Sequence, residues 1–415
     1  MVRYVRRQVL GLAIVTACAG PASASASDTC SPLMDWNQLA LDATVTAGQG
    51  AVPQIRSMAI VHASIHDAVN AITGAYSTYL PAQAVPEGAS ADAAVVGAAS
   101  GALARLFSTQ ADWAARRSAY LDRCGLAGDP GAGFGDAVAG TIYQLRLTDG
   151  SAQAQYPYSA PGAGLPGVWV PTGTAPASLP GWGRVTPWVL QSGSQFRPDP
   201  PPSLDSGRYA RDFNETKMLG ALDGSSRTSD QTQIAIFWDG SPSAIWNSVA
   251  RGVIGARGLD LSSAARAFAL MYIAGADASI ACFDAKYTYN FWRPITAIHR
   301  ADEDGNDETV PDLTWASLIT THPHPDYPSG HSTNSAAMAT TLALLFGDDP
   351  GVAIVANSPR NPSFPRNWST FSEGVDEVIE ARIYIGFHFR TADETGARMG
   401  RQVARYVFNH TLRDN

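Results

Sequence analysis

The stretch from residue 322 to residue 331, HPHPDYPSGH, constrains the fold more than any other part of this sequence. Its prolines favour an extended backbone, because proline fixes φ and disfavours helix at the preceding residue. Beyond it, apolar residues recur at helical spacing as far as residue 346. Ser329, Gly330 and His331 are therefore predicted to lie at or just before a helix N-terminus. Free backbone N–H groups and the helix dipole favour an anion at such a position.

The residue types at this helix start suit an oxyanion. Gly330 has no Cβ, so an oxygen atom can come close to the backbone. Ser329 can donate a hydroxyl hydrogen bond, and His331 can exchange protons near neutral pH. A serine N-cap followed by an exposed histidine would explain the same letters, so this stretch alone does not decide between the two interpretations.

A second group of chemically useful residues lies on a predicted helix over residues 261–292. Lys286, Tyr289 and Arg293 are at positions i, i+3 and i+7, so they share one face. Arg293 precedes Pro294, and the helix is predicted to end there. Two cations with no acid on their face need an anionic partner. The alternative is a pair of surface cations on an amphipathic helix.

A third group surrounds a predicted break between two helices near the C-terminus. Arg382 ends the first helix, and Gly386 allows the chain to leave it. Residues 391–394, TADE, have the form of a capping box that starts the second helix. His388 is then just before another helix N-terminus. Asp393 is assigned to the capping box and not to catalysis.

Taken together, the three groups form a set that suits a tetrahedral, multiply charged oxyanion. One histidine can bond the central atom while the other moves protons on the opposite side. No carboxylate cluster accompanies the histidines, so no metal-cation site is implied. The set is Lys286, Arg293, Arg382, Ser329, the Gly330 N–H, His331 and His388.

These motifs, Lys286-x6-Arg293-Pro, Pro-Ser-Gly-His331 and Arg382-x3-Gly-x-His388, resemble the three-part signature shared by vanadium-dependent haloperoxidases and type 2 phosphatidic acid phosphatases. The resemblance implies vanadate as cofactor, with phosphate able to occupy the same site. It implies that His388 bonds vanadium, or attacks phosphorus in a phosphatase, and that His331 is the acid/base. The oxygens would be held by Lys286, Arg293, Ser329, Gly330 and Arg382.

The chain departs from the family pattern at several positions. Ala381 replaces the usual serine before Arg382, and Ala392 stands where an aspartate usually follows the second histidine. His324 resembles the histidine of bromoperoxidases at a position where the fungal chloroperoxidase has phenylalanine. Phe283 occupies a position that is often tryptophan. His324 and Phe283 are therefore candidates for the halide site.

Two enzyme functions use the same residues. The first is a vanadium-dependent haloperoxidase, which would oxidise a halide, bromide being favoured by His324, with hydrogen peroxide to hypohalous acid and so halogenate a small organic acceptor. The alternative is a secreted acid phosphatase, a phosphomonoesterase in which His388 forms a phosphohistidine and His331 protonates the leaving group. A non-enzymatic oxyanion-binding protein is a third interpretation.

Amphipathic, alanine-rich segments predict an all-α fold of helical bundles, and no convincing strand is present. Residues 155–206 are rich in proline, glycine and aromatic residues without a period, which indicates an ordered excursion over a pocket mouth. We predict a signal peptide over residues 1–26, an N-terminal helical half with the excursion over 27–205, and a C-terminal bundle carrying the oxyanion site over 206–415.

Export is predicted from the N-terminus, which has arginines, a short apolar core and small-x-small cleavage sites. The mature protein would be secreted or periplasmic; a lipid anchor on Cys18 is the alternative. A bridge between Cys30 and Cys124 would suit an exported protein, whereas Cys282 is predicted to be buried. A His62–His66 pair on a predicted helix has no third ligand nearby and indicates a core or surface histidine pair.

Charge and hydropathy exclude some partners. The formal net charge is -8 and no basic stripe is present, which argues against a nucleic-acid partner. After the signal peptide, no stretch is predicted to span a bilayer; the best candidate, around residues 267–282, is interrupted by Asp277. A homo-oligomer of this chain is compatible with the sequence.

Overall fold

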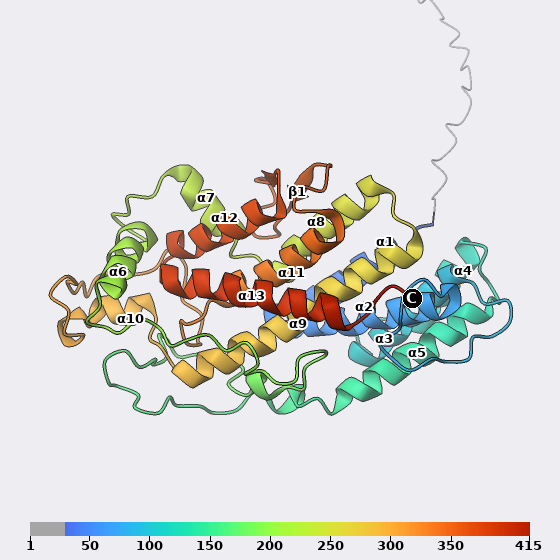
Figure 1. The fold of residues 1–415 in the computed structure, drawn as a ribbon, viewed down its shortest axis with the longest axis horizontal. Helices are drawn as coiled ribbons and strands as arrows, with labels where there is room; N and C mark the ends of the chain where they lie inside the picture. Colours follow the sequence, from blue (N-terminus) through green and yellow to red (C-terminus); the bar gives the residue numbers. More distant parts are fainter. Residues whose placement is uncertain (1–29) are drawn as a thin grey trace, which may run out of the picture. The chain divides into compact units, whose positions relative to one another are not determined.

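The computed structural model describes residues 30–415, and their regular secondary structure is almost entirely helical, as predicted (Figure 1). The first half contains α1 (Pro32–Thr46), α2 (Ala51–Thr73), α3 (Ala91–Leu106), α4 (Trp113–Arg123), α5 (Pro130–Leu147) and the 3-10 turns η1 (Ser151–Gln153) and η2 (Trp182–Arg184). The second half contains α6 (Gly207–Gly220), α7 (Ser229–Phe237), α8 (Pro242–Arg257), α9 (Leu261–Tyr289), α10 (Pro294–His299), η3 (Ala301–Glu303), α11 (Gly330–Phe346), α12 (Phe371–Tyr384) and α13 (Arg390–His410).

One short hairpin interrupts this helical architecture. Strand β1 (Ile354–Ala356) pairs antiparallel with β2 (Arg366–Trp368), and Ile354 lies opposite Trp368. The expectation of no strand was wrong here. Three-residue strands are too short for an alternating pattern to be visible in the sequence.

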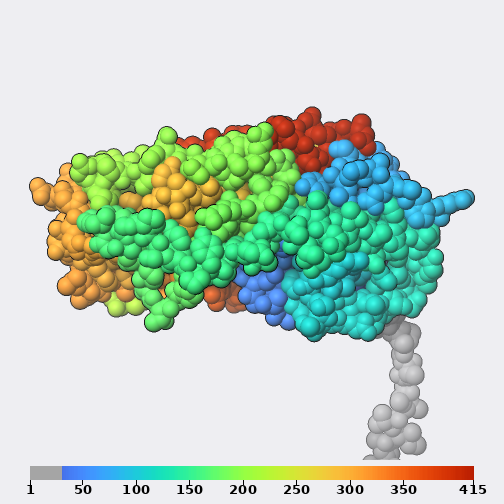
Figure 2. Space-filling model, turned by 90° about the horizontal axis from the view of Figure 1, so that it is seen from below, coloured from blue at the N-terminus to red at the C-terminus, as the bar shows by residue number. Residues whose placement is uncertain are grey.

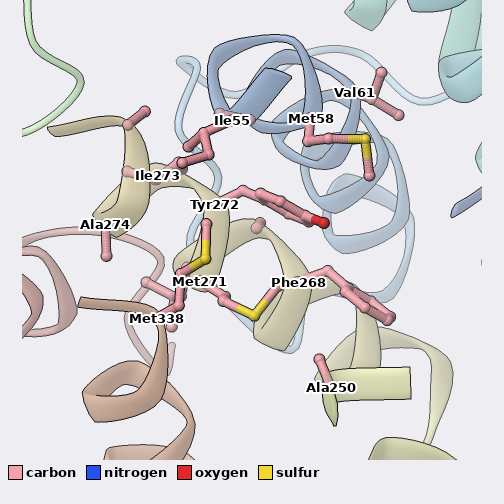
Figure 3. Close-up of a cluster of buried hydrophobic side chains, with 14 of the residues drawn as sticks. Ile55, Met58, Val61, Ala250, Phe268, Met271, Tyr272, Ile273, Ala274 and Met338 are labelled. Carbon is pink, nitrogen blue, oxygen red and sulfur yellow. The ribbon is translucent and has the colours of Figure 1, made fainter. Parts of the chain in front are cut away.

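Helix α9 is the central element of the core. It has 29 residues, and nearly all of them from Ser262 to Lys286 are buried. Figure 3 shows Phe268, Met271 and Tyr272 of this helix against side chains from α2, α8 and α11. A Cβ on Gly275 would lie 2.6 Å from Met338 Cε, so the missing side chain permits close packing against α11.

Helix α9 is also long and apolar enough to cross a membrane by length and composition, contrary to the expectation that no segment would be. Within the folded protein, 94% of the most apolar 18-residue stretch of α9 is buried. A core helix surrounded by α2, α8 and α11 accounts for that composition, because a helix that is apolar all round is buried on every side.

Helix α9 ends earlier than the sequence predicted. Asn290 adopts a left-handed conformation with φ of 49° and donates its N–H to the Lys286 carbonyl, which closes the helix at Tyr289. Arg293 is therefore not on the same helical face as Lys286; it is the N-cap residue of α10. Tyr289 turns away from the site, and its hydroxyl bonds the Pro198 carbonyl.

The close packing of α11 on α13 fixes the position of the PSGH segment. A Cβ on Gly396 would lie 2.6 Å from the Ser329 carbonyl oxygen, and one on Gly400 would lie 2.1 Å from the Thr333 carbonyl oxygen. Only glycine at these two positions, one turn apart on α13, allows the backbones to approach so closely. The start of α11 is consequently held against the first turns of α13.

The proline-rich excursion is ordered, as predicted, and lies as a continuous green strip across one face of the protein (Figure 2). Its anchor is Asp277 in the middle of α9, which is fully buried. The Asp277 carboxylate accepts the backbone N–H groups of Trp188, Val189 and Leu190 at 2.6, 2.8 and 3.0 Å. Three backbone donors stabilise this buried carboxylate, which has no lysine or arginine within salt-bridge distance among residues 30–415.

Residues 32–415 form one compact unit, and the proposed boundary at residue 205 stays a prediction. The predicted signal peptide and Cys18 lie outside the described residues. Cys30 and Cys124 are disulfide-bonded, and Cys282 is a free, buried thiol. His62 is a buried core histidine bonded to Asn37, the first of the two alternatives for the His62–His66 pair.

Candidate active site at the start of α11

The chain breaks after α9, before α11 and before α13 meet at one cavity of about 180 Å³. This cavity contains most of the residues singled out in the sequence. They are Phe283, His324, Gly330, His331, Arg382 and His388. His322 also lines it, as do Ser178 and Leu179, so part of the excursion lines the cavity.

Arg293 links the second and third motifs. It is fully buried, its Nε donates to the His324 carbonyl at 2.7 Å, and its Nη1 donates to the Phe387 carbonyl at 2.8 Å. The same Nη1 lies 3.2 Å from His388 Nε2. A guanidinium only donates, so His388 Nε2 carries a lone pair and not a proton.

Lys286 is the second buried cation. Its Nζ donates to the carbonyl oxygens of Pro325 and Asp326 at 2.7 and 3.0 Å. Burial lowers the pKa of Lys286 to about 7. Gly330 lies beside it, because a Cβ there would be 3.9 Å from Lys286 Cε. An anion bound between these two residues would favour the protonated lysine.

Arg382 is the third buried cation, and most of its hydrogen-bonding capacity is unused. Nη1 donates to the Trp238 carbonyl at 2.9 Å. Its Nε and Nη2 are buried and have no partner within residues 30–415. Burial lowers the pKa of Arg382 to about 10, so the guanidinium is charged at neutral pH. Its charged end lies 4.8 Å from the centre of the Phe387 ring.

Ser329 is the N-cap residue of α11, as predicted, but its side chain does not cap the helix. The Ser329 hydroxyl faces the Asp393 carboxylate without reaching hydrogen-bond geometry, and it has no other partner in the described part of the chain. Nε2 of His331 is likewise buried without a partner there. Burial and the charge of Arg382 lower the pKa of His331 well below its usual value, so its imidazole is neutral.

The donor set fits a small oxyanion. Buried polar atoms without hydrogen-bond partners are rare in folded proteins. Here the Ser329 hydroxyl, two Arg382 nitrogens and His331 Nε2 form such a group beside one cavity. Vanadate and phosphate offer acceptor oxygens in the geometry that guanidinium groups and helix N-termini bind.

Asp326 is a candidate functional residue that the sequence did not reveal. Its Oδ1 lies 2.7 Å from His388 Nδ1, and both side chains are buried. Because His388 Nε2 accepts from Arg293, the proton lies on Nδ1 and is donated to Asp326. This bond orients the imidazole, which is the function that the missing carboxylate at Ala392 would have had. The only signal in the sequence was an acid within HPHPDYPSGH.

Asp393 was assigned to a capping box, and that assignment was wrong. Helix α13 begins at Arg390 with Phe389 as N-cap, so residues 391–394 are already helical. The Asp393 carboxylate is fully buried and accepts the Ser332 hydroxyl at 2.7 Å. Burial raises its pKa to about 7. Asp393 therefore packs against Ser332 and faces Ser329, and it does not cap α13.

The two halide-site candidates lie together in the cavity. The rings of Phe283 and His324 are 5.7 Å apart. His324 Nδ1 lies 2.9 Å from Arg293 Nη2, which only donates, and 3.2 Å from the Pro325 carbonyl, which only accepts. The shorter contact makes Nδ1 an acceptor and leaves the proton on Nε2. Burial and the charges of Lys286 and Arg293 lower the pKa of His324 well below its usual value. His324 is thus a neutral N–H donor next to an apolar ring.

Comparison with known proteins agrees with this architecture. A family model described as "VCPO second helical-bundle domain" matches residues 266–414. A vanadium chloroperoxidase from Curvularia inaequalis is 25% identical over an alignment of 279 residues, and the match covers 51% of this chain and 45% of that protein. A crystal structure of a bacterial vanadium-dependent iodoperoxidase superposes with a TM-score of 0.80 at 25% identity, covering 92% of this chain and 97% of the other.

Residues 266–414 therefore match the second helical-bundle domain of the vanadium chloroperoxidase family, and the described chain has the fold of vanadium-dependent haloperoxidases. A bacterial vanadium-dependent chloroperoxidase in its apo form shares the fold, with a TM-score of 0.69 at 16% identity over 87% of this chain and 94% of the other. The matched segment spans about half the length of the Curvularia enzyme.

In a cavity surrounded by buried cations, the depressed pKa of Lys286 has a measurable consequence. Below pH 7 the ammonium is charged and binds an oxyanion; above it the ligand-free protein must first take up a proton. We expect orthovanadate affinity to fall above pH 7, by at most about tenfold per pH unit. Equilibrium dialysis against orthovanadate between pH 6 and 9 measures this.

Two variants isolate the lysine contribution. Lys286→Met should bind vanadate weakly and lose this part of the pH dependence. Lys217→Met, which changes a lysine outside the cavity, should follow the wild type. An unchanged pH profile in Lys286→Met would contradict the assignment.

Proposed function

We propose that this protein is a haloperoxidase that holds vanadate and uses hydrogen peroxide to oxidise a halide to hypohalous acid. The observation that supports it best is the group of buried, unpaired donors on Ser329 and Arg382 beside the cavity that also holds His388. When bound, vanadate supplies a centre that activates hydrogen peroxide for the two-electron oxidation of a halide. The relatives are named for this chemistry with chloride and iodide.

The protein side chains have distinct roles in this proposal. Lys286, Arg293 and Arg382 place three positive charges around the oxyanion in a dry site, where electrostatic stabilisation is strongest. His388 presents its Nε2 lone pair to the central atom while its Nδ1–H is held by Asp326. His331 holds or releases a proton at Nε2, as a general acid/base.

An acid phosphatase is the second candidate, and one observation favours it. The absence of an aspartate at position 392 argued against a nucleophilic histidine at 388. Asp326 supplies a carboxylate to the same imidazole from a different motif. A histidine whose Nδ1–H is held by a carboxylate is oriented for attack through Nε2.

Bromide as the halide, a small organic molecule as the final acceptor and export through residues 1–26 are further parts of the proposal. The choice of bromide rests on His324, a neutral N–H donor beside Phe283. Export rests on the basic, apolar and small-residue pattern of the N-terminus.

One pair of assays tests the function. The purified protein is freed of vanadate and phosphate, then given orthovanadate, hydrogen peroxide and chloride, bromide or iodide in turn, with a phenol dye as acceptor. In parallel it is given a nitrophenyl phosphate. Halogenation that depends on vanadate, and is fastest with bromide, is expected. Phosphate release without halogenation would favour the phosphatase instead.

His324→Ala is expected to change halide use more than vanadate binding. The imidazole contributes an N–H to the cavity, whereas vanadate is held mainly by the three cations. We expect KM for bromide to rise about tenfold, which corresponds to the net contribution of one hydrogen bond, with vanadate affinity within about threefold. Halide titrations and dialysis measure the two quantities. Equal losses in both would contradict a halide role.

A further inference from the structure

His322 is the one histidine of this cavity to which nothing above gives a role. Its ring is parallel to that of His324 at 6.0 Å and to that of His331 at 6.5 Å, and it meets Phe387 edge-on at 5.1 Å. His322 and His331 are both partly exposed, but the Nε2 atom of His331 is buried. Within residues 30–415 the ring nitrogens of His322 make no hydrogen bond. His322 therefore lies beside His331, is partly exposed, and has both ring nitrogens free to exchange protons.

The proposed reaction requires a group that delivers protons to the cavity. Hydrogen peroxide, a halide ion and one proton give hypohalous acid and water. The O–O bond breaks, an O–halogen bond forms, the halide loses two electrons, and the leaving oxygen departs as water after taking up the proton. One proton must enter the cavity in each turnover.

The charges around the cavity oppose the entry of this proton. Lys286, Arg293 and Arg382 are all buried cations beside the cavity, and they repel hydronium. His331 cannot recover its proton directly from bulk water because its Nε2 is buried. A neutral imidazole avoids the difficulty, since it takes a proton on one nitrogen and releases one from the other.

We propose that His322 relays protons from solvent to His331, and this rests on the proposed function. A ring separation of 6.5 Å leaves room for one bridging water between the two imidazoles. His322 acts through His331 and does not itself touch the halide or the oxyanion.

The charges around His322 are consistent with a neutral relay. The groups that act on it are Arg382 from α12, Lys286 from α9, Arg293 before α10, and Arg360, and each disfavours the imidazolium. Burial and these charges lower the pKa of His322 to about 3. The rings of His324 and His331 beside it are neutral for the same reason. An anion held by the three buried cations would reduce this repulsion.

The test compares His322→Ala with the wild type in dilute buffer, with and without free imidazole. We expect kcat to fall by about a hundredfold, the lower range for loss of a positioned proton-transfer group. Added imidazole should restore at least about tenfold of that loss, and vanadate affinity by equilibrium dialysis should stay within about twofold. His410→Ala, at the exposed end of α13, should match the wild type with and without imidazole.

The outcomes separate the relay from the proposed function. A wild-type enzyme that halogenates while His322→Ala is equally fast would overturn the relay alone. A loss that imidazole does not restore, with an equal loss of vanadate affinity, would assign His322 a structural role and also overturn it. If the wild type only cleaves nitrophenyl phosphate, the same comparison applies to protonation of that leaving group. A wild type inert in both assays removes the relay together with the proposed function.

Discussion

Arg382→Ala is expected to weaken vanadate binding severely and to lower every activity of the cavity with it. The change removes one buried cation and both unpaired guanidinium nitrogens from the site. Truncating one partner of a buried, hydrogen-bonded charge pair costs about 2–5 kcal/mol. This corresponds to a loss of affinity between roughly thirtyfold and several thousandfold. Equilibrium dialysis against orthovanadate and the two activity assays measure it.

Controls separate loss of the site from loss of the fold. Arg382→Ala also leaves the Trp238 carbonyl without its donor, so thermal melts must accompany the assays. Arg382→Lys keeps the charge but loses the planar pair of donors, and we expect intermediate affinity. Arg401→Ala changes a partly exposed arginine on α13 and should be neutral. Full activity in a folded Arg382→Ala protein would show that the oxyanion is held elsewhere.

Asp326→Ala is expected to weaken vanadate binding and slow turnover by about 10- to 100-fold, the usual effect of removing a group that orients a ligating histidine. Without the carboxylate, the His388 Nδ1 proton loses its acceptor at 2.7 Å, and the imidazole can rotate or change tautomer. Dialysis and steady-state kinetics measure the two losses.

The conservative variant distinguishes orientation from packing. Asp326→Asn keeps an acceptor oxygen of the same shape in the same place, so it should retain more vanadate affinity than Asp326→Ala. Asp284→Ala, which removes a carboxylate from the outer side of α9, should leave vanadate affinity unchanged. If the Asn and Ala variants lose vanadate affinity equally, His388 is not positioned through that oxygen.

The sequence predicted the helical class and most helix positions because long amphipathic segments carry a strong periodic signal. It failed where a single residue overrode the period. Asn290 closes α9 before Arg293, although the apolar spacing continues to residue 292. The hairpin around Ile354 and Trp368 was missed because two three-residue strands have no readable pattern.

Within the candidate site, local motifs located the cations and histidines, but the carboxylates were misjudged. Asp393 matched the letters of a capping box, yet Phe389 is the N-cap and Asp393 faces Ser332. Asp326 and His388 are 62 residues apart, and only tertiary packing brings them within 2.7 Å. Spacing along one helix cannot reveal such a pair.

Because the excursion is anchored on Asp277, we expect it to resist cleavage by proteases. Residues 155–206 have the proline and glycine content of a cleavable connector, but the turn at 188–190 donates three amides to a carboxylate in the centre of α9. Cleavage there requires that the core helix lose its contacts first. Amide hydrogens of Trp188, Val189 and Leu190 should therefore exchange with deuterium as slowly as those of α9, and chymotrypsin, which cleaves after aromatic residues and leucine, should spare the segment until global unfolding.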